Sequence, residues 1–192
     1  MDETIKPNRR STVVVTLLAS GIFLIGAGLI PLFINAQQKA LAIAAPIFPP
    51  ATTNFPGPQL ALTDVQGKPV SFKTYPGKVI LVNNWAPWCP PCVTEMPELQ
   101  AYYTAHSADG FIVIAIDAGD PAVNVAEFVK DNRLTFPVWL DPLGKSLVFF
   151  KNWDLPSSYV IDREGIVRYS WTGEVNQQTL EKYVTPLLEA KK

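Results

Sequence analysis

The chain has 192 residues and a formal net charge of −1, and 48% of its residues are hydrophobic against 17% that are charged. This composition can bury a core, which excludes a wholly disordered chain, and the balanced charge gives no electrostatic footprint for nucleic acid. Two cysteines and one histidine exclude a multi-bridge secreted scaffold and a four-cysteine zinc site.

The chain begins with a short basic segment followed by a long apolar run. Residues 1–12 include three basic side chains, and the 22 residues from Val13 to Ile34 include no charge. As a helix rising about 1.5 Å per residue, this run would span roughly 33 Å, enough for the hydrocarbon core of a bilayer. We therefore predict a cytoplasmic N-terminus at 1–12, a transmembrane anchor at 13–35 and an extracytoplasmic remainder. A cleaved signal peptide is the alternative, although its apolar region is normally shorter.

Prolines are dense in the segment after the apolar run. Five of them lie between residues 46 and 58. Prolines at this density favour an extended chain over a packed element. We predict a Pro-rich tether over residues 36–58 and a folded domain over residues 59–192.

Strand and helix patterns alternate along the predicted domain. In chain order they indicate a hairpin of 60–62 and 70–72, a strand at 79–82, a helix from Pro90 to about Tyr103, a strand at 111–116, a helix at 121–132, a short strand at 137–140, a short helix at 144–150, a hairpin of 158–162 and 166–171, and an amphipathic helix at 176–190. This order predicts an α/β fold in which a central mixed sheet has helices on both faces.

The candidate site is a C-x-x-C pair, Cys89 and Cys92, between a predicted strand and a predicted helix. A helix N-terminus has unpaired N–H groups and a partial positive charge, so we expect the pKa of the Cys89 thiol to lie below its ordinary value of about 8.5. Cys92, one helical turn deeper, would be within reach of the Cys89 sulfur. We predict that Cys89 is the exposed nucleophile and that Cys92 resolves the mixed disulfide. Half of a metal site and a local structural disulfide are the alternatives.

The residues around this pair resemble the W-x-x-W-C-x-P-C motif of the thioredoxin superfamily. The matching positions are Trp85, Trp88, Cys89, Pro91 and Cys92. Further segments make residues 58–190 similar to the membrane-anchored TlpA/ResA-like branch, among them 92–97, 136–141 and 155–165. The resemblance implies a thioredoxin-like fold with an N-terminal hairpin and an extra strand–helix insertion, preceded by one transmembrane helix.

The resemblance also assigns substrate contacts. It implies a cis peptide bond before Pro156, which would present the backbone of Leu155 to a bound peptide by strand-like pairing. Trp85 and Trp88 would form an apolar rim for the substrate, although Trp85 equally fits plain core packing.

An acidic residue near the cysteines is a feature of this branch, and Glu95 matches it. If Glu95 is buried, its pKa would rise and it could shuttle a proton for Cys92. As a first-turn acid it would instead stabilise the helix dipole. Many thioredoxins have Asp at the position of Asn83, which cannot titrate, so Glu95 is the nearest candidate proton carrier. Asn84 stands where relatives usually have an aromatic residue.

Together these residues predict a thiol–disulfide oxidoreductase that uses neither cofactor nor metal. The resemblance implies that it reduces disulfides of exported proteins at the cell membrane, including apocytochrome c, with a membrane electron-transfer protein as thiol donor. The redox direction depends on a potential that the sequence does not give. The alternatives are a thiol peroxidase, although peroxiredoxins have Thr where Ala86 stands, and an extracytoplasmic copper-binding module with two thiolate ligands.

Overall fold

The computed structural model describes residues 49–190. The predicted cytoplasmic segment 1–12, the anchor 13–35 and residues 36–48 of the tether lie outside the described residues. Among the helices of the described part, none has the length and apolar character needed to cross a membrane.

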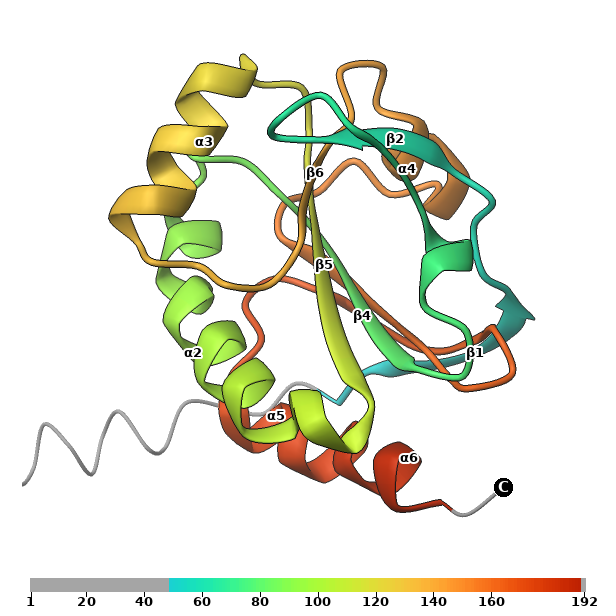
Figure 1. Cartoon of the computed structure of the whole chain (residues 1–192). Helices are drawn as coiled ribbons and strands as arrows, with labels where there is room; N and C mark the ends of the chain where they lie inside the picture. The colour runs from blue at the N-terminus through green and yellow to red at the C-terminus, as the bar shows by residue number, and fades with distance from the viewer. Residues whose placement is uncertain (1–48, 191–192) are drawn as a thin grey trace, which may run out of the picture. The chain divides into compact units, whose positions relative to one another are not determined.

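An eight-stranded sheet forms the centre of the domain, with strand order β1-β8-β7-β4-β5-β6-β2-β3 (Figure 1). Its strands are β1 (Ala51–Pro56), β2 (Ala61–Asp64), β3 (Pro69–Ser71), β4 (Val79–Trp85), β5 (Phe111–Asp117), β6 (Val138–Leu140), β7 (Ser157–Ile161) and β8 (Ile166–Thr172). The helices are α2 (Pro90–His106), α3 (Ala122–Asp131), α4 (Lys145–Phe150), α5 (Gln177–Tyr183) and α6 (Thr185–Glu189), with 3₁₀ turns η1 (Phe72–Thr74) and η2 (Ser107–Asp109).

The sheet is mixed, as predicted. Strands β4, β5 and β6 are parallel, and the other pairings are antiparallel. Parallel neighbours need a crossover, which α2 supplies between β4 and β5 and α3 between β5 and β6. Consequently one end of the sheet holds the C-terminal residues of β4, β5, β6 and β8 and the N-terminal residues of β1 and β7. We call this the cysteine end, because the C-x-x-C pair follows β4.

Helices cover both faces of the sheet, and the alternation of side chains along the strands explains why. In β4, Val79 and Leu81 point into the main core cluster, which also takes in residues of α2, α3, α5 and α6. Ile80 and Val82 point to the other face, where the hairpin and Phe150 of α4 pack. Because β4 is buried on both faces, its first four residues, 79–82, form the apolar run typical of a central parallel strand.

The predicted tether is wrong over residues 51–56, which form strand β1. This strand pairs antiparallel with β8, Ala51 opposite Ser170 and Phe55 opposite Val167. Phe55 packs against the second core cluster, so the segment buries apolar surface that the count of prolines does not reveal. Pro56 is tolerated because it ends an edge strand, where its missing N–H breaks no ladder. The domain therefore begins before residue 59.

The predicted C-terminal helix 176–190 is two helices, α5 and α6, which meet at Val184. Pro186 causes the break, because proline lacks the N–H of a continuous helix and disfavours helical backbone at the residue before it. The predicted N-terminal hairpin is present as β2 and β3, with Leu62 opposite Val70. The inserted elements are α3 and β6, which lie between β5 and α4.

Candidate functional site

The two cysteines lie at the junction of β4 and α2. Trp85 is the last residue of β4 and Pro90 is the first of α2. A disulfide joins Cys89 to Cys92, with their Cα atoms 5.3 Å apart. The strand ends in the core, so the pair is held by packed elements on either side.

Cys89 is the N-cap residue of α2, and its sulfur takes the place of a capping oxygen. The Cys92 backbone N–H donates a hydrogen bond to Cys89 Sγ at 3.3 Å. Pro90 and Pro91 have no N–H, so the amide of Cys92 is the first free donor of the helix. The Cys89 sulfur therefore sits where a helix stabilises negative charge, which is the condition for a reactive thiolate.

The expectation that Cys89 is exposed is wrong for the disulfide form. Cys89 keeps 4% of its surface exposed and Cys92 keeps none, because both belong to the main core cluster. The difference in exposure between the two cysteines is still informative. Of the two cysteines, only Cys89 keeps any exposed surface.

Glu95 is buried in α2 and bonded from two directions. Its Oε1 accepts from Asn83 Nδ2 at 2.7 Å and its Oε2 accepts from the Val175 backbone N–H at 2.9 Å. Asn83 Nδ2 also donates to Ser158 Oγ at 3.0 Å. Burial raises the pKa of Glu95 to about 8, against the lowering effect of its two hydrogen bonds. The helix-dipole alternative is excluded, because α2 has no acidic residue in its first turn.

The Leu155–Pro156 peptide bond is cis, in agreement with the resemblance. Pro156 is buried, and its carbonyl accepts a hydrogen bond from the Gly173 N–H at 2.8 Å. Leu155 is half-buried against the cluster that holds both cysteines. Among residues 49–190 the backbone of Leu155 makes no hydrogen bond.

Comparison with known proteins decides the family. The sequence model of the AhpC/TSA family matches residues 54–170. The chain belongs to the AhpC/TSA family. It is 35% identical over 127 residues to the thiol-disulfide oxidoreductase ResA of Bacillus thuringiensis subsp. konkukian, an alignment that covers 66% of this chain and 73% of that protein.

Other relatives agree. Over 122 residues, covering 62% of this chain and 73% of that protein, it is 29% identical to the sporulation thiol-disulfide oxidoreductase A of Bacillus subtilis. The crystal structure of a putative thiol:disulfide interchange protein DsbE from Chlorobium tepidum has a TM-score of 0.66 and 26% identity, covering 70% of this chain and 96% of that one. This AhpC/TSA-family protein is thus a thiol–disulfide oxidoreductase with a thioredoxin-like α/β fold.

The two tryptophans of the oxidoreductase motif have different surroundings. Trp85 is fully buried and its ring lies 4.8 Å from that of Phe128, so its assignment to a substrate rim is wrong and the core-packing alternative holds. Its position at the end of β4 points it into the same face as Leu81. Trp88 is 69% exposed directly before Cys89.

Two members of the hydrogen-bond network around Glu95 in the oxidoreductase were not predicted: Ser158, which accepts from Asn83, and Val175, which donates to Glu95. Ser158 lies on β7 beside Asn83 of β4, and Val175 is 80 residues from Glu95 in the chain. Only the presence of Asn83 in an apolar strand signals a buried polar group there. A backbone amide such as that of Val175 has no signature in the side-chain sequence.

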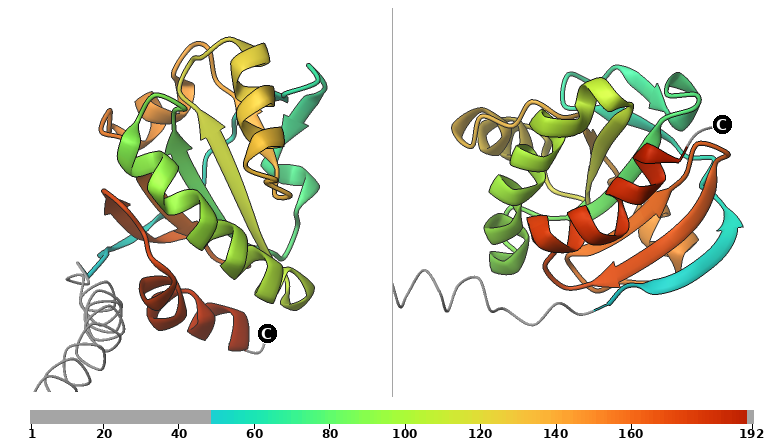
Figure 2. Two further views of the ribbon diagram at one scale, coloured as in Figure 1. Left: turned by 90° about the vertical axis from the view of Figure 1, so that its left-hand side faces the viewer. Right: turned by 90° about the horizontal axis from the view of Figure 1, so that it is seen from below.

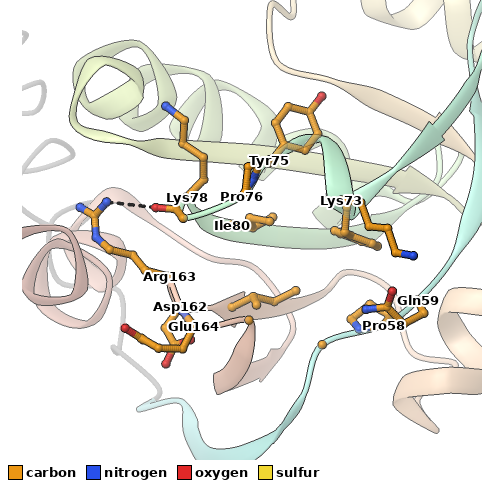
Figure 3. A pocket seen from close by; sticks show the side chains of 15 residues that line it. Pro58, Gln59, Lys73, Tyr75, Pro76, Lys78, Ile80, Asp162, Arg163 and Glu164 are labelled. Atoms are coloured by element: carbon orange, nitrogen blue, oxygen red, sulfur yellow. Dashed lines mark hydrogen bonds between the residues drawn. The ribbon is translucent and has the colours of Figure 1, made fainter. Parts of the chain in front are cut away.

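A cavity of about 300 Å³ lies at the opposite end of the sheet from the cysteines (Figure 3). It holds none of the predicted site residues. Arg163 on its wall donates to the carbonyls of Gly77 at 3.2 Å and Leu188 at 2.9 Å, which ties the chain before β4 to α6. The cavity is lined both by charged side chains and by apolar ones such as Phe72 and Ile80.

Proposed function

We propose that this oxidoreductase reduces disulfides of exported proteins outside the cytoplasm, held at the cell membrane by residues 13–35. Cys89 attacks and Cys92 resolves. The observation that carries the proposal is the position of Cys89 Sγ at the N-terminus of α2, where it accepts the first free amide of the helix. The anchor rests on the uncharged run in the sequence.

The reaction transfers two electrons from the dithiol to the substrate. The Cys89 thiolate attacks one sulfur of the substrate disulfide, forms a mixed disulfide and releases the other sulfur as a thiolate that takes up a proton. Cys92 then loses its proton and attacks Cys89 Sγ, which closes the Cys89–Cys92 disulfide and releases the second substrate thiol. A membrane electron-transfer protein would restore the dithiol as thiol donor.

Glu95 is the proposed proton carrier for Cys92. It lies three residues along the same helix, and its pKa of about 8 lets it exchange a proton near neutral pH. Asn83 holds the carboxyl group in place and cannot itself titrate. Resolution by Cys92 is the step that this proton transfer would serve.

Substrate contacts are proposed at two places. The exposed Trp88 forms an apolar rim beside Cys89. The unbonded backbone of Leu155 is available to pair with an extended segment of the substrate. Apocytochrome c is the substrate that the resemblance to the ResA-like branch suggests.

Insulin reduction by the purified full-length protein tests this proposal. We expect turnover with dithiothreitol in the wild type and none in Cys89→Ser, while Cys92→Ser accumulates a mixed disulfide. A reduction potential of the pair near about −300 mV would fit a reductant, and one near about −120 mV would contradict it. Retained turnover in Cys89→Ser would disprove the assigned nucleophile.

The two alternatives have less support. A peroxiredoxin-like activity would need a hydroxyl where the buried Ala86 stands, and rapid consumption of peroxide by the reduced protein would revive it. In residues 49–190 no three Cys, His, Asp or Glu side chains group as metal ligands. A copper-binding module in this part of the chain would therefore have only the two cysteine thiolates as ligands. Tight stoichiometric Cu(I) binding without disulfide exchange would favour that module.

A further inference from the structure

Strand β4 has two buried asparagines in succession, Asn83 and Asn84, directly before its last residue. Because side chains alternate along a strand, the two amides lie on opposite faces of the sheet. Asn83 faces α2, and its Nδ2 donates to Glu95 and to Ser158 of β7. Asn84 lies on the face that packs against α4, where it meets Ser146. In the left view of Figure 2, α2 and α3 lie in front of the sheet, on the face away from α4.

Asn84 and two serines form a buried chain of hydrogen bonds. Ser146 Oγ on α4 donates to Asn84 Oδ1 at 2.6 Å, and Asn84 Nδ2 donates to Ser157 Oγ at 3.3 Å. Each of the three residues keeps at most 1% of its surface exposed. The Ser146 backbone N–H donates to Asp141 Oδ2 at 2.7 Å, which fixes the start of α4 beside the chain. We call Asn84, Ser146 and Ser157 the amide–serine chain.

The amide–serine chain joins the two segments that meet the substrate in the proposed function. Asn84 precedes the segment that leads out of β4 to Cys89, and Ser157 is the second residue after Leu155. Asn84 and Ser157 are also register partners in the antiparallel pair of β4 and β7. Together with the bond that Asn83 makes on the other face, amide–hydroxyl pairs fix β4 against β7 from both sides.

A buried polar chain specifies an alignment that apolar packing alone leaves looser. An amide buried among apolar side chains is costly unless it is bonded, so the fold favours the one arrangement that satisfies Asn84. Ser157 is the first paired residue of β7, so this arrangement is fixed two residues from Leu155, where the ladder of β4 and β7 ends. Rates are sensitive to such alignment, because a misplacement of about 1 Å can slow a reaction about 100-fold.

We infer that Asn84, Ser146 and Ser157 are positioning residues, which set the place of the Leu155 backbone relative to Cys89. The enzyme would thereby favour disulfides in extended protein segments, which pair with Leu155, over small disulfides, which meet Cys89 alone. The inference rests on the proposed function, because it takes the attack by Cys89 and the pairing at Leu155 from it. Asn84 stands where relatives usually have an aromatic residue, and its bonds to both serines account for an amide here.

The test replaces the whole amide–serine chain with apolar groups, in Asn84→Leu/Ser146→Ala/Ser157→Ala of the full-length protein. Removing all three polar side chains together leaves none of them unpaired, so this triple variant should keep its fold. Ser157→Ala is the milder second variant. Thr53→Val is the matched control, since it also removes a bonded hydroxyl, from Thr53 Oγ1 to the Val167 carbonyl at 2.8 Å, but on the edge strand β1.

The measurement compares a protein disulfide with a small one. Pre-reduced protein, freed of dithiothreitol, is mixed with insulin or with hydroxyethyl disulfide, and the rate of thiol–disulfide exchange is followed for each. We expect the triple variant to slow insulin reduction at least about tenfold and reduction of the small disulfide less than about twofold. Ser157→Ala should slow insulin reduction at least about threefold with the same selectivity, and Thr53→Val should change neither rate.

Three results would overturn the inference. An unchanged insulin rate in Ser157→Ala would show that the amide–serine chain sets no position, whether or not the triple variant folds. An equal fall with both disulfides would place the effect on the cysteines or on the folded fraction. An equal fall in the insulin rate of Thr53→Val would make it a general loss of stability. Failure of the proposed function is distinct, because the wild-type protein itself would then fail to reduce insulin.

Discussion

Replacing Glu95 by Gln changes the charge of a buried group while keeping its shape. Asn83 Nδ2 can still donate to the side-chain oxygen, but the new amide faces the Val175 N–H, a second donor. One hydrogen bond is therefore lost. At low pH, where Glu95 is neutral, we expect this loss to cost about 1 kcal/mol of unfolding free energy.

The pH dependence of the unfolding free energy acts against this loss and favours Glu95→Gln at high pH. The folded protein holds the pKa of Glu95 at about 8, against 4.5 for an ordinary glutamate. Between these values only the folded state keeps the proton, so rising pH favours the unfolded state. At roughly 1.4 kcal/mol per pKa unit, wild-type stability falls by about 5 kcal/mol from pH 4.5 to 8 through this group. Glu95→Gln escapes that loss, so its stability should exceed wild type by a few kcal/mol near pH 8.5.

Urea unfolding of the oxidised protein at pH 5 and pH 8.5 tests this expectation, because Glu95→Gln should be less stable than wild type at the lower pH and more stable at the higher. We call this change of order the crossing. The functional counterpart is the pH profile of insulin reduction, where we expect Glu95→Gln to be at least about tenfold slower at pH 7 and to lack a rise near pH 8. If the unfolding free energies of the two proteins changed with pH in parallel, the claim that Glu95 is buried and neutral in the folded protein would be refuted. A crossing with an unchanged rate profile would refute its role as proton carrier.

Three further substitutions separate packing from chemistry. Trp85→Ala should lower unfolding free energy by about 3–5 kcal/mol in urea titrations, because the indole is fully buried. Trp88→Ala should change it by less than about 0.5 kcal/mol and raise KM for insulin reduction, and an unchanged KM would remove Trp88 from the rim. Pro91→Ala gives the helix a second amide near Cys89 Sγ and should lower the thiol pKa by about one unit, measured as the pH dependence of iodoacetamide alkylation.

Local patterns predicted much of the fold because they report which face of each element is buried. The apolar runs of β4 and β5 and the hairpin around Gly165 follow directly from strand and turn chemistry. Strand β1 was missed because its pairing with β8 is more than a hundred residues away in the chain. The same prolines that suggest a tether are compatible with an edge strand.

The site was predictable to the extent that its chemistry is local. Cys89, Cys92 and the helix start lie within a few residues of one another, so their arrangement follows from the sequence. The burial of Trp85, the near-burial of Cys89 and the bond from Val175 to Glu95 depend on elements that meet only in the folded domain. Spacing along the chain does not determine such contacts.

The central claim is that the N-terminus of α2 makes the Cys89 sulfur an easily formed anion. It is tested by titrating the Cys89 thiol in the reduced protein, through the pH dependence of its alkylation, with Cys92→Ser to isolate one thiol. The account predicts a pKa well below about 8.5, within the range of roughly 3.5–7.5 seen for thiols at helix N-termini. A pKa equal to that of free cysteine would contradict it.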